Sequence, residues 1–139
     1  MSSRLNPYIS FDGNAREAMT AYQSVFGGDL AITTYAEFGN AEGGDADKIM
    51  HSQLETPSGY TIMGADNPPH QKFEPGNNLS LSLSGTDADA DEMRGYFAQL
   101  AEGGTVTVPL EKQMWGDDFG MCVDRFGIAW MVNIGQPQA

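Results

Sequence analysis

Hydrophobic and polar residues alternate along two separate stretches of the chain. Residues 4–11 place leucine, proline, isoleucine and phenylalanine on one face, and asparagine, tyrosine and serine on the other. Residues 78–84 alternate leucine with serine after an initial asparagine. An alternation with a period of two predicts a strand that packs on one side and is open on the other.

Each alternating stretch leads into a segment with helical spacing. The first helix follows Asn14, which together with Glu17 resembles a capping box. The second follows Thr86 or Asp87. Apolar residues then recur at i, i+3, i+4 and i+7, which predicts a helix with one buried stripe. The predicted stripes are Ala15, Ala18, Met19, Tyr22, Val25 and Phe26 in the first helix, and Ala90, Met93, Phe97 and Leu100 in the second.

Two hairpins complete a repeated order of elements. They turn at Gly59 and at Gly127, 68 residues later, and each joins two runs of strand-forming residues. Another strand is predicted at 30–35 and at 105–108, where Pro109 interrupts it. The order is β-α-β-β-β, twice. We therefore predict an α+β fold in a single domain, 1–139, made of tandem repeats at about 4–66 and 78–134. They would form a curved mixed sheet around a cleft, with the helices on the outer face.

The polar faces of the two alternating strands suggest a binding surface. At an offset of 72 residues Asn6 matches Asn78, and Tyr8 matches Ser80. Two half-sheets side by side would curve round a trough lined by Asn6, Tyr8, Ser10, Asn78, Ser80 and Ser82. A concave surface with a few convergent polar groups is the usual form of a small-molecule site. An equally simple explanation is that these residues face water on an open sheet.

The charge of the chain excludes some classes of binding partner. It has 7 basic and 19 acidic residues and a formal net charge of −12. Nucleic acid and anionic membranes both require clustered Lys and Arg, so neither is expected as a partner.

The lone Cys122 excludes an intrachain disulfide and lies in an apolar strand, where a packing role is favoured over a nucleophilic one. No apolar run has the length of a signal peptide or a membrane span, so we expect a cytoplasmic protein.

Three segments resemble those of a known superfamily. They are Asn6-Pro-Tyr-Ile-Ser-Phe-Asp-Gly13, Ile49-Met-His51 and Asp124-Arg-Phe-Gly-Ile-Ala-Trp130, set within the double β-α-β-β-β order. Together they resemble the vicinal oxygen chelate superfamily, which includes glyoxalase I, bleomycin-resistance proteins and extradiol dioxygenases. Within it they look like the PhnB-like branch. The resemblance covers nearly the whole chain.

The resemblance also identifies where a metal would bind. Metalloenzymes of this superfamily hold a divalent ion with His or Glu from the first and last strands of each half. Carried onto this chain, those positions fall near Asn6 (or Tyr8), Met63, Asn78 and Met131. Amides and thioethers bind Zn²⁺, Fe²⁺ or Ni²⁺ far more weakly than His and Glu do. We therefore expect no metal centre and no cofactor.

Two functions remain as hypotheses. The first is a metal-free small-molecule-binding protein, as the bleomycin-resistance proteins are. Its candidate ligand-binding residues are Asn6, Tyr8, Met63, Asn78, Ser80, Trp115 and Met131. The alternative is a lyase, isomerase or dioxygenase-like enzyme with a non-standard metal or proton-transfer site near His51, beside Asp66 or Glu37. Periodicity leaves the sheet face of His51 open. Superfamily members commonly pair across a two-fold axis, so we expect a homodimer.

Overall fold

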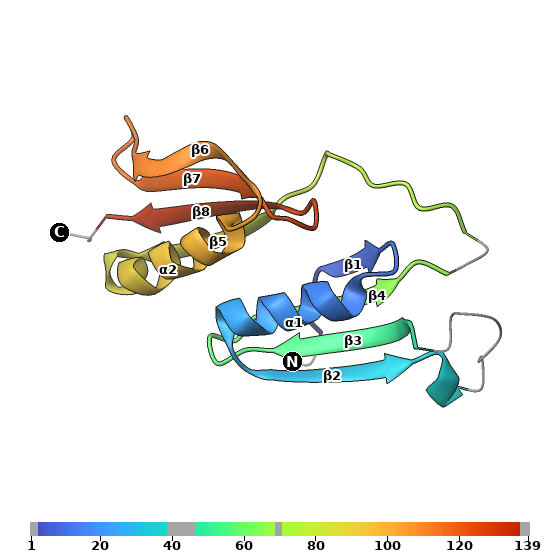
Figure 1. The fold of residues 1–139 in the computed structure, drawn as a ribbon. Coiled ribbons are helices and arrows are strands. Elements are labelled where there is room, and N and C mark those ends of the chain that lie inside the picture. Colours follow the sequence, from blue (N-terminus) through green and yellow to red (C-terminus); the bar gives the residue numbers. More distant parts are fainter. Residues whose placement is uncertain (1–2, 39–46, 69–70, 137–139) are drawn as a thin grey trace. The chain divides into compact units, whose positions relative to one another are not determined.

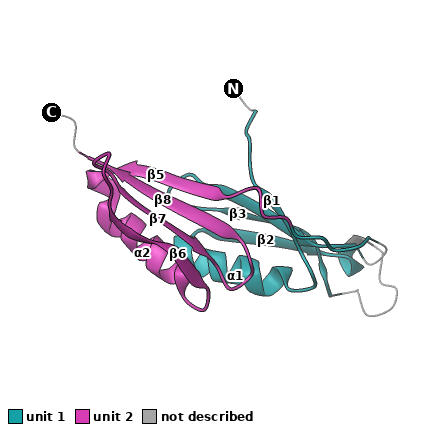
Figure 2. Ribbon diagram, turned by 90° about the horizontal axis from the view of Figure 1, so that it is seen from above, with its two compact units in different colours: residues 1–75 teal, residues 76–139 magenta. Residues whose placement is uncertain are grey.

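The computed structural model describes residues 3–38, 47–68 and 71–136, and the chain divides into two compact units, residues 1–75 and 76–139 (Figures 1 and 2). Each unit holds one α-helix and four strands in the predicted order. The elements of unit 1 are β1 (Tyr8–Phe11), α1 (Ala15–Phe26), β2 (Asp29–Thr34), the 3₁₀ turn η1 (Ala36–Phe38), β3 (Ile49–Glu55) and β4 (Thr61–Asp66). Those of unit 2 are β5 (Leu81–Thr86), the 3₁₀ turn η2 (Asp87–Asp89), α2 (Ala90–Ala101), β6 (Thr105–Lys112), β7 (Asp118–Val123) and β8 (Ala129–Gly135).

Each unit forms its own four-stranded mixed sheet. The strand orders are β1-β4-β3-β2 and β5-β8-β7-β6, so the first strand of each unit lies beside its last. That pair is parallel, and the remaining neighbours are antiparallel. The predicted α+β class and the tandem β-α-β-β-β repeat are confirmed. No helix in the described part of the chain is long and apolar enough to span a membrane.

The helix of each unit packs on one face of its sheet. In unit 1, α1 contacts β2, β3 and β4, and in unit 2, α2 contacts all four strands. Five of the six residues in the first predicted stripe are buried, and Val25 is only partly covered. In α2 the buried residues are Met93, Tyr96, Phe97 and Leu100. The prediction missed Tyr96 and included Ala90, which is only partly covered.

Three predicted strands have different limits in the structure. The first alternating stretch becomes a strand only at Tyr8, and the second only at Leu81, so Leu79 is 86% exposed rather than packed. The strand predicted to stop at Pro109 continues to Lys112. Proline is tolerated there because β6 is an edge strand, and its register against β7 is irregular on both sides of Val108.

A residue distant in sequence accepts a hydrogen bond from the first turn of α1. Asn14 occupies the N-cap position, but its side chain makes no capping hydrogen bond, so the predicted capping box is wrong. The buried Asp66 carboxylate, at the end of β4, takes its place. Its Oδ1 accepts the Ala15 N–H at 2.9 Å, and its Oδ2 accepts the Ile49 N–H at 2.8 Å. Asp66 therefore joins α1, β3 and β4.

Both units contain the same close approach between two backbone segments. A Cβ on Gly28 would lie 2.0 Å from the carbonyl oxygen of Glu55, and one on Gly104 would lie 2.1 Å from that of Val123. Glu55 and Val123 are the last residues of the third strand of their units. Only glycine fits at either position, because any other side chain would displace backbone.

We expect Gly104→Ala to destabilise the protein by roughly 1–3 kcal/mol, because overpacking against a fixed backbone carries that cost. Gly28→Ala should lose more stability than Gly104→Ala, since Gly28 combines the steric clash with a φ of +102°. Gly59→Ala is the matched control: Gly59 has a φ of +89° but open space around it, so it should lose only about 1 kcal/mol. Urea unfolding of the three variants measures this order. A loss in Gly59→Ala as large as that in Gly104→Ala would refute the steric explanation.

Candidate functional site

The face of each sheet opposite its helix carries no helix of its own unit, and here we call it the open face. In unit 1, Ser52 and Leu54 of β3 are fully buried on the helix side. Side chains alternate along a strand, so His51 and Gln53 lie on the open face. This settles the question that periodicity left open for His51. The strand register adds their neighbours, so that the open face of unit 1 carries Tyr8, Ser10, Thr33, His51, Gln53, Glu55, Thr61 and Met63.

Tyr8 and His51 form a pair on this face. The Tyr8 hydroxyl lies 3.2 Å from His51 Nδ1, and the two ring centroids are 5.7 Å apart. Partial burial, and then the nearby Tyr35 phenol, raise the pKa of Tyr8 above its ordinary value. The phenol therefore keeps its proton at neutral pH. When it donates that proton to Nδ1, the neutral imidazole carries its own proton on Nε2.

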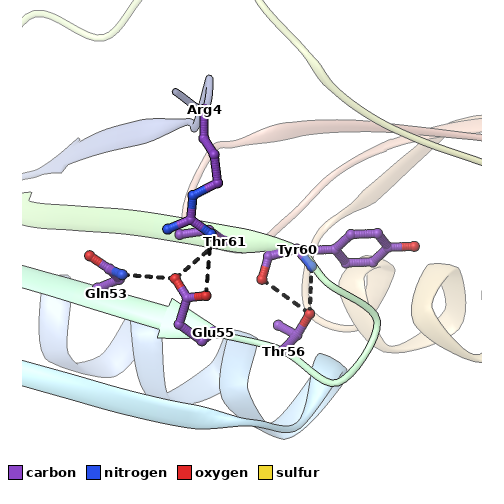
Figure 3. Close-up of polar contacts among 6 residues, drawn as sticks. All are labelled: Arg4, Gln53, Glu55, Thr56, Tyr60 and Thr61. Atoms are coloured by element: carbon purple, nitrogen blue, oxygen red, sulfur yellow. Dashed lines mark hydrogen bonds and ion pairs between the residues drawn. The ribbon is translucent and has the colours of Figure 1, made fainter. Parts of the chain in front are cut away.

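Glu55 lies at the end of β3 in a network of polar contacts (Figure 3). Its Oε1 accepts hydrogen bonds from Thr61 Oγ1 at 2.9 Å and from Gln53 Nε2 at 2.7 Å. Its Oε2 lies 3.6 Å from Nη1 of Arg4, which also donates to Thr61 Oγ1 at 3.2 Å. The bond from Thr61, then that from Gln53, and the weaker effect of Arg4 lower the pKa of Glu55. The carboxylate is thus both charged and fixed in orientation.

The open face of unit 2 carries different chemistry. The residues equivalent to His51, Gln53 and Met63, by position in the strand ladder, are Phe119, Met121 and Met131. Trp115, in the turn between β6 and β7, lies edge-on against Phe119 with ring centroids 5.8 Å apart, and it remains 58% exposed. Two polar residues border this apolar surface. Ser82 is paired with Met131 across the parallel strands, and Asn133 Nδ2 donates to Asp117 Oδ2 at 3.0 Å.

The structure brings some of the predicted ligand-binding residues together within a unit. Tyr8 is paired with Met63 in unit 1. In unit 2, however, Met131 is paired with Ser82, while Asn78 and Ser80 are exposed and precede β5. The first strands therefore correspond at an offset of 74 residues, and the predicted offset of 72 is wrong. A run of alternating leucine and serine matches itself after a shift of two residues, so alternation alone does not fix the register.

The predicted partners of His51 are not brought to it. The carboxylate of Asp66 lies on the helix side of the sheet, where it binds the N–H of Ala15 and Ile49. Glu37 is exposed in η1. The side chain that contacts His51 is Tyr8, which the sequence analysis considered as a ligand-binding residue and not as a partner of His51. The second histidine of the chain, His70, lies outside the described residues.

The donors at the superfamily's metal positions do not fit a transition metal. In unit 1 these positions hold the phenol of Tyr8 and the thioether of Met63, and in unit 2 the hydroxyl of Ser82 and the thioether of Met131. Zn²⁺ and Fe²⁺ favour imidazole, carboxylate and thiolate. Within residues 3–38, 47–68 and 71–136, no three His, Cys, Asp or Glu side chains are grouped so that they could hold an ion.

Cys122 lies on the covered side of β7, 1% exposed. Burial, and then the charge of Asp124, raise the pKa of its thiol to about 11. A thiol that stays protonated at neutral pH is a poor nucleophile, which agrees with the predicted packing role.

The sequence analysis missed four residues of the open faces, namely Gln53, Glu55, Thr61 and Phe119. Knowing the strand register of the two hairpins would have placed these residues on the open faces.

Comparison with solved structures shows which known fold this architecture shares. A glyoxylase/bleomycin resistance protein/dioxygenase domain from Frankia has the same fold, with a TM-score of 0.63 at 16% identity, covering 100% of this chain and 96% of that one. The double β-α-β-β-β arrangement is thus the fold of that domain.

Residues 3–133 match the family described as 3-demethylubiquinone-9 3-methyltransferase. The chain belongs to this PhnB-like family. Protein PA1353 from Pseudomonas aeruginosa is 40% identical, with a TM-score of 0.81, covering 98% of this chain and 100% of that one. The PhnB protein from Bacillus cereus is 25% identical, with a TM-score of 0.74, covering 96% and 100%.

The Glu55 network gives a testable pH dependence. Its folded-state pKa is lowered, so the carboxylate stabilises the fold above the ordinary glutamate range, and that contribution is lost as the pH falls through the lowered value. Thr61→Val removes the bond with the largest effect and should raise the pKa of Glu55 towards the ordinary value of about 4.3. Carbon-13 NMR titration of the carboxyl group measures it. Thr33→Val, on the same face but in β2, should leave it unchanged; equal shifts in the two variants would contradict the assignment.

Proposed function

We propose that this chain binds small molecules on its open sheet faces without a transition metal, and that the face of unit 2 does so through aromatic contacts and neutral hydrogen bonds. The observation that carries the proposal is the exposed aromatic pair of unit 2. Trp115 is 58% exposed while its ring rests against Phe119. Phe119 thus restrains a large ring that remains accessible. Such a ring offers extensive contact area at a low cost in side-chain entropy.

The surroundings of this pair support the same proposal. Met121 and Met131 place two thioethers beside Phe119, and methionine adapts its shape to apolar ligands. Ser82 and Asn133 add hydrogen-bonding groups at the border. A mainly apolar surface with a few polar groups that set orientation has the composition of a ligand site.

Methyl transfer, the activity in the family's description, is not part of the proposed function. Methyl transfer needs a donor molecule, and nucleotide-bearing cofactors are commonly held on a glycine-rich turn between a parallel strand and a helix. In this chain the turn from β1 to α1 spans residues 12–14 and holds one glycine, and β5 leads directly into η2. Neither turn favours that activity.

A thermal-shift screen against metabolites and antibiotics, followed by titration of the hits, tests the binding function. Trp115→Ala should weaken the binding of a hit by about 1 kcal/mol, or about fivefold in Kd, because an aromatic contact is lost. Ser82→Ala should lose a similar amount through one neutral hydrogen bond. Met114→Ala is the matched control, because Met114 adjoins Trp115 and is 97% exposed.

Three outcomes would count against the proposal. Full affinity in both Trp115→Ala and Ser82→Ala would place the site elsewhere. A loss in Asn78→Ala with no loss in Ser82→Ala would favour the lining predicted from the sequence over the one defined by the strand register. Loss of binding after chelation, with a stoichiometric metal found by elemental analysis, would refute metal-free recognition.

A second candidate function is proton-transfer catalysis at His51. The contact between Tyr8 and His51 Nδ1 on the open face supports it, because a hydrogen bond that fixes one ring nitrogen leaves a defined role for the other. A neutral imidazole is a suitable base for a carbon acid or a hydroxyl group. The lyase and isomerase reactions in our alternative hypothesis both need such a base.

Incubation of each hit with the protein in deuterated water tests this second function. Catalytic proton transfer would exchange an acidic C–H of the ligand for deuterium, which mass spectrometry detects. His51→Asn should slow the exchange at least about 100-fold, the lower end of what a general base contributes. Thr33→Val, on the same face but in β2, is the control. Exchange at an unchanged rate in His51→Asn would exclude the role.

The homodimer stays a prediction, and we propose it as the working assembly of the protein. Sedimentation as a monomer at micromolar concentration would exclude it.

A further inference from the structure

The carboxylate of Glu55 is held ready on the open face of unit 1. Thr61 and Gln53 both donate to Oε1, at 2.9 and 2.7 Å, so two neutral side chains fix the orientation of the carboxylate before any ligand is present (Figure 3). Oε2 is left for another partner. A carboxylate that is already oriented loses little entropy when it binds a cation.

The partner of Oε2 in this structure is Arg4, in the segment that precedes β1. Nη1 of Arg4 lies 3.6 Å from Glu55 Oε2 and 3.2 Å from Thr61 Oγ1. The Arg4 and Glu55 side chains are 56% and 45% exposed, and Leu5 beside them is fully exposed. The segment is anchored further along, where Pro7 accepts the Met63 N–H at 3.1 Å. An exposed ion pair of this kind is weak, so Arg4 can leave without disturbing the strands.

We propose that Glu55, Gln53 and Thr61 form a binding subsite for the guanidinium or primary ammonium group of a ligand on the open face of unit 1, and that Arg4 occupies it when no ligand is bound. The inference rests on the proposed small-molecule binding and names the charge of the ligand. Arg4 itself demonstrates that a guanidinium fits between the carboxylate and the threonine hydroxyl. The formal net charge of −12 adds long-range attraction for a cation.

The same face also indicates the extent of such a ligand. His51 and Glu55 lie on one strand four positions apart and on the same side, which corresponds to about 13 Å of strand length. Gln53 and Met63 lie between them. A ligand that places its cation on Glu55 would extend along the sheet towards the rings of Tyr8 and His51. A cationic group joined to a flat body fits this face.

Benzamidine, with isosteric but neutral benzamide, tests the subsite. In NMR titrations of the whole chain, benzamidine should shift the amides around Glu55 and Thr61, and benzamide should not. Arg4→Ala removes the competing guanidinium and should tighten benzamidine binding about two- to fivefold, the range for an exposed ion pair. Glu55→Gln keeps a similar shape but removes the charge, and should weaken it about tenfold.

Glu111→Gln is the matched control, since it removes one exposed carboxylate from unit 2 and should leave benzamidine affinity unchanged. Thermal unfolding of each variant checks that the fold persists, and Arg4→Ala tests the idea without altering the sheet. Equal binding of benzamidine and benzamide, or no gain in Arg4→Ala, would overturn the subsite. If panel hits still depend on Trp115 in that case, the proposed function stands alone; if no compound binds either face, both fail.

Discussion

The contact on which both units depend is the approach of a glycine to the last carbonyl of the third strand. Gly28 meets Glu55 in unit 1, and Gly104 meets Val123 in unit 2. Each glycine stands just before the strand that follows the helix, so the chain leaves the helix pressed directly against the sheet. That entry sets the helix against one face of its sheet, and the candidate sites lie on the opposite face.

The two units share this geometry but stabilise the start of their helical segments with different hydrogen bonds. In unit 1 the buried carboxylate of Asp66 binds the first turn of α1 and the start of β3. The residue at the equivalent position of β8 is Ile134, and unit 2 instead closes η2 with a local capping box between Thr86 and Asp89. A distant carboxylate and a local box therefore serve the same purpose. Because neither uses the open face, that face can diverge without weakening the helix–sheet packing.

The order of elements could be predicted from the sequence because periodicity and turn glycines are local signals. The missing details are those that depend on distant residues. Asn14 has the chemistry of a cap, but a carboxylate 52 positions later in the chain binds the helix N-terminus. The alternation around Ser82 fits two registers equally well, and only pairing with Met131 distinguishes them. The pairing of Tyr8 with His51 likewise requires the parallel β1–β4 contact, which no short-range pattern encodes.

The same scaffold positions carry opposite chemistry in the two units. Unit 1 presents His51, Gln53 and Glu55 along its third strand, and the equivalent residues of unit 2 are Phe119, Met121 and Val123. Backbone geometry does not require this difference, because both strands pair with the last strand of their unit in the same register. The polar series is moreover organised, since Thr61 and Gln53 hold Glu55 in one orientation. A face that only met water would gain little from such an arrangement. The contrast is what recognition of different chemical groups on the two faces would require, a charged group on unit 1 and an apolar one on unit 2.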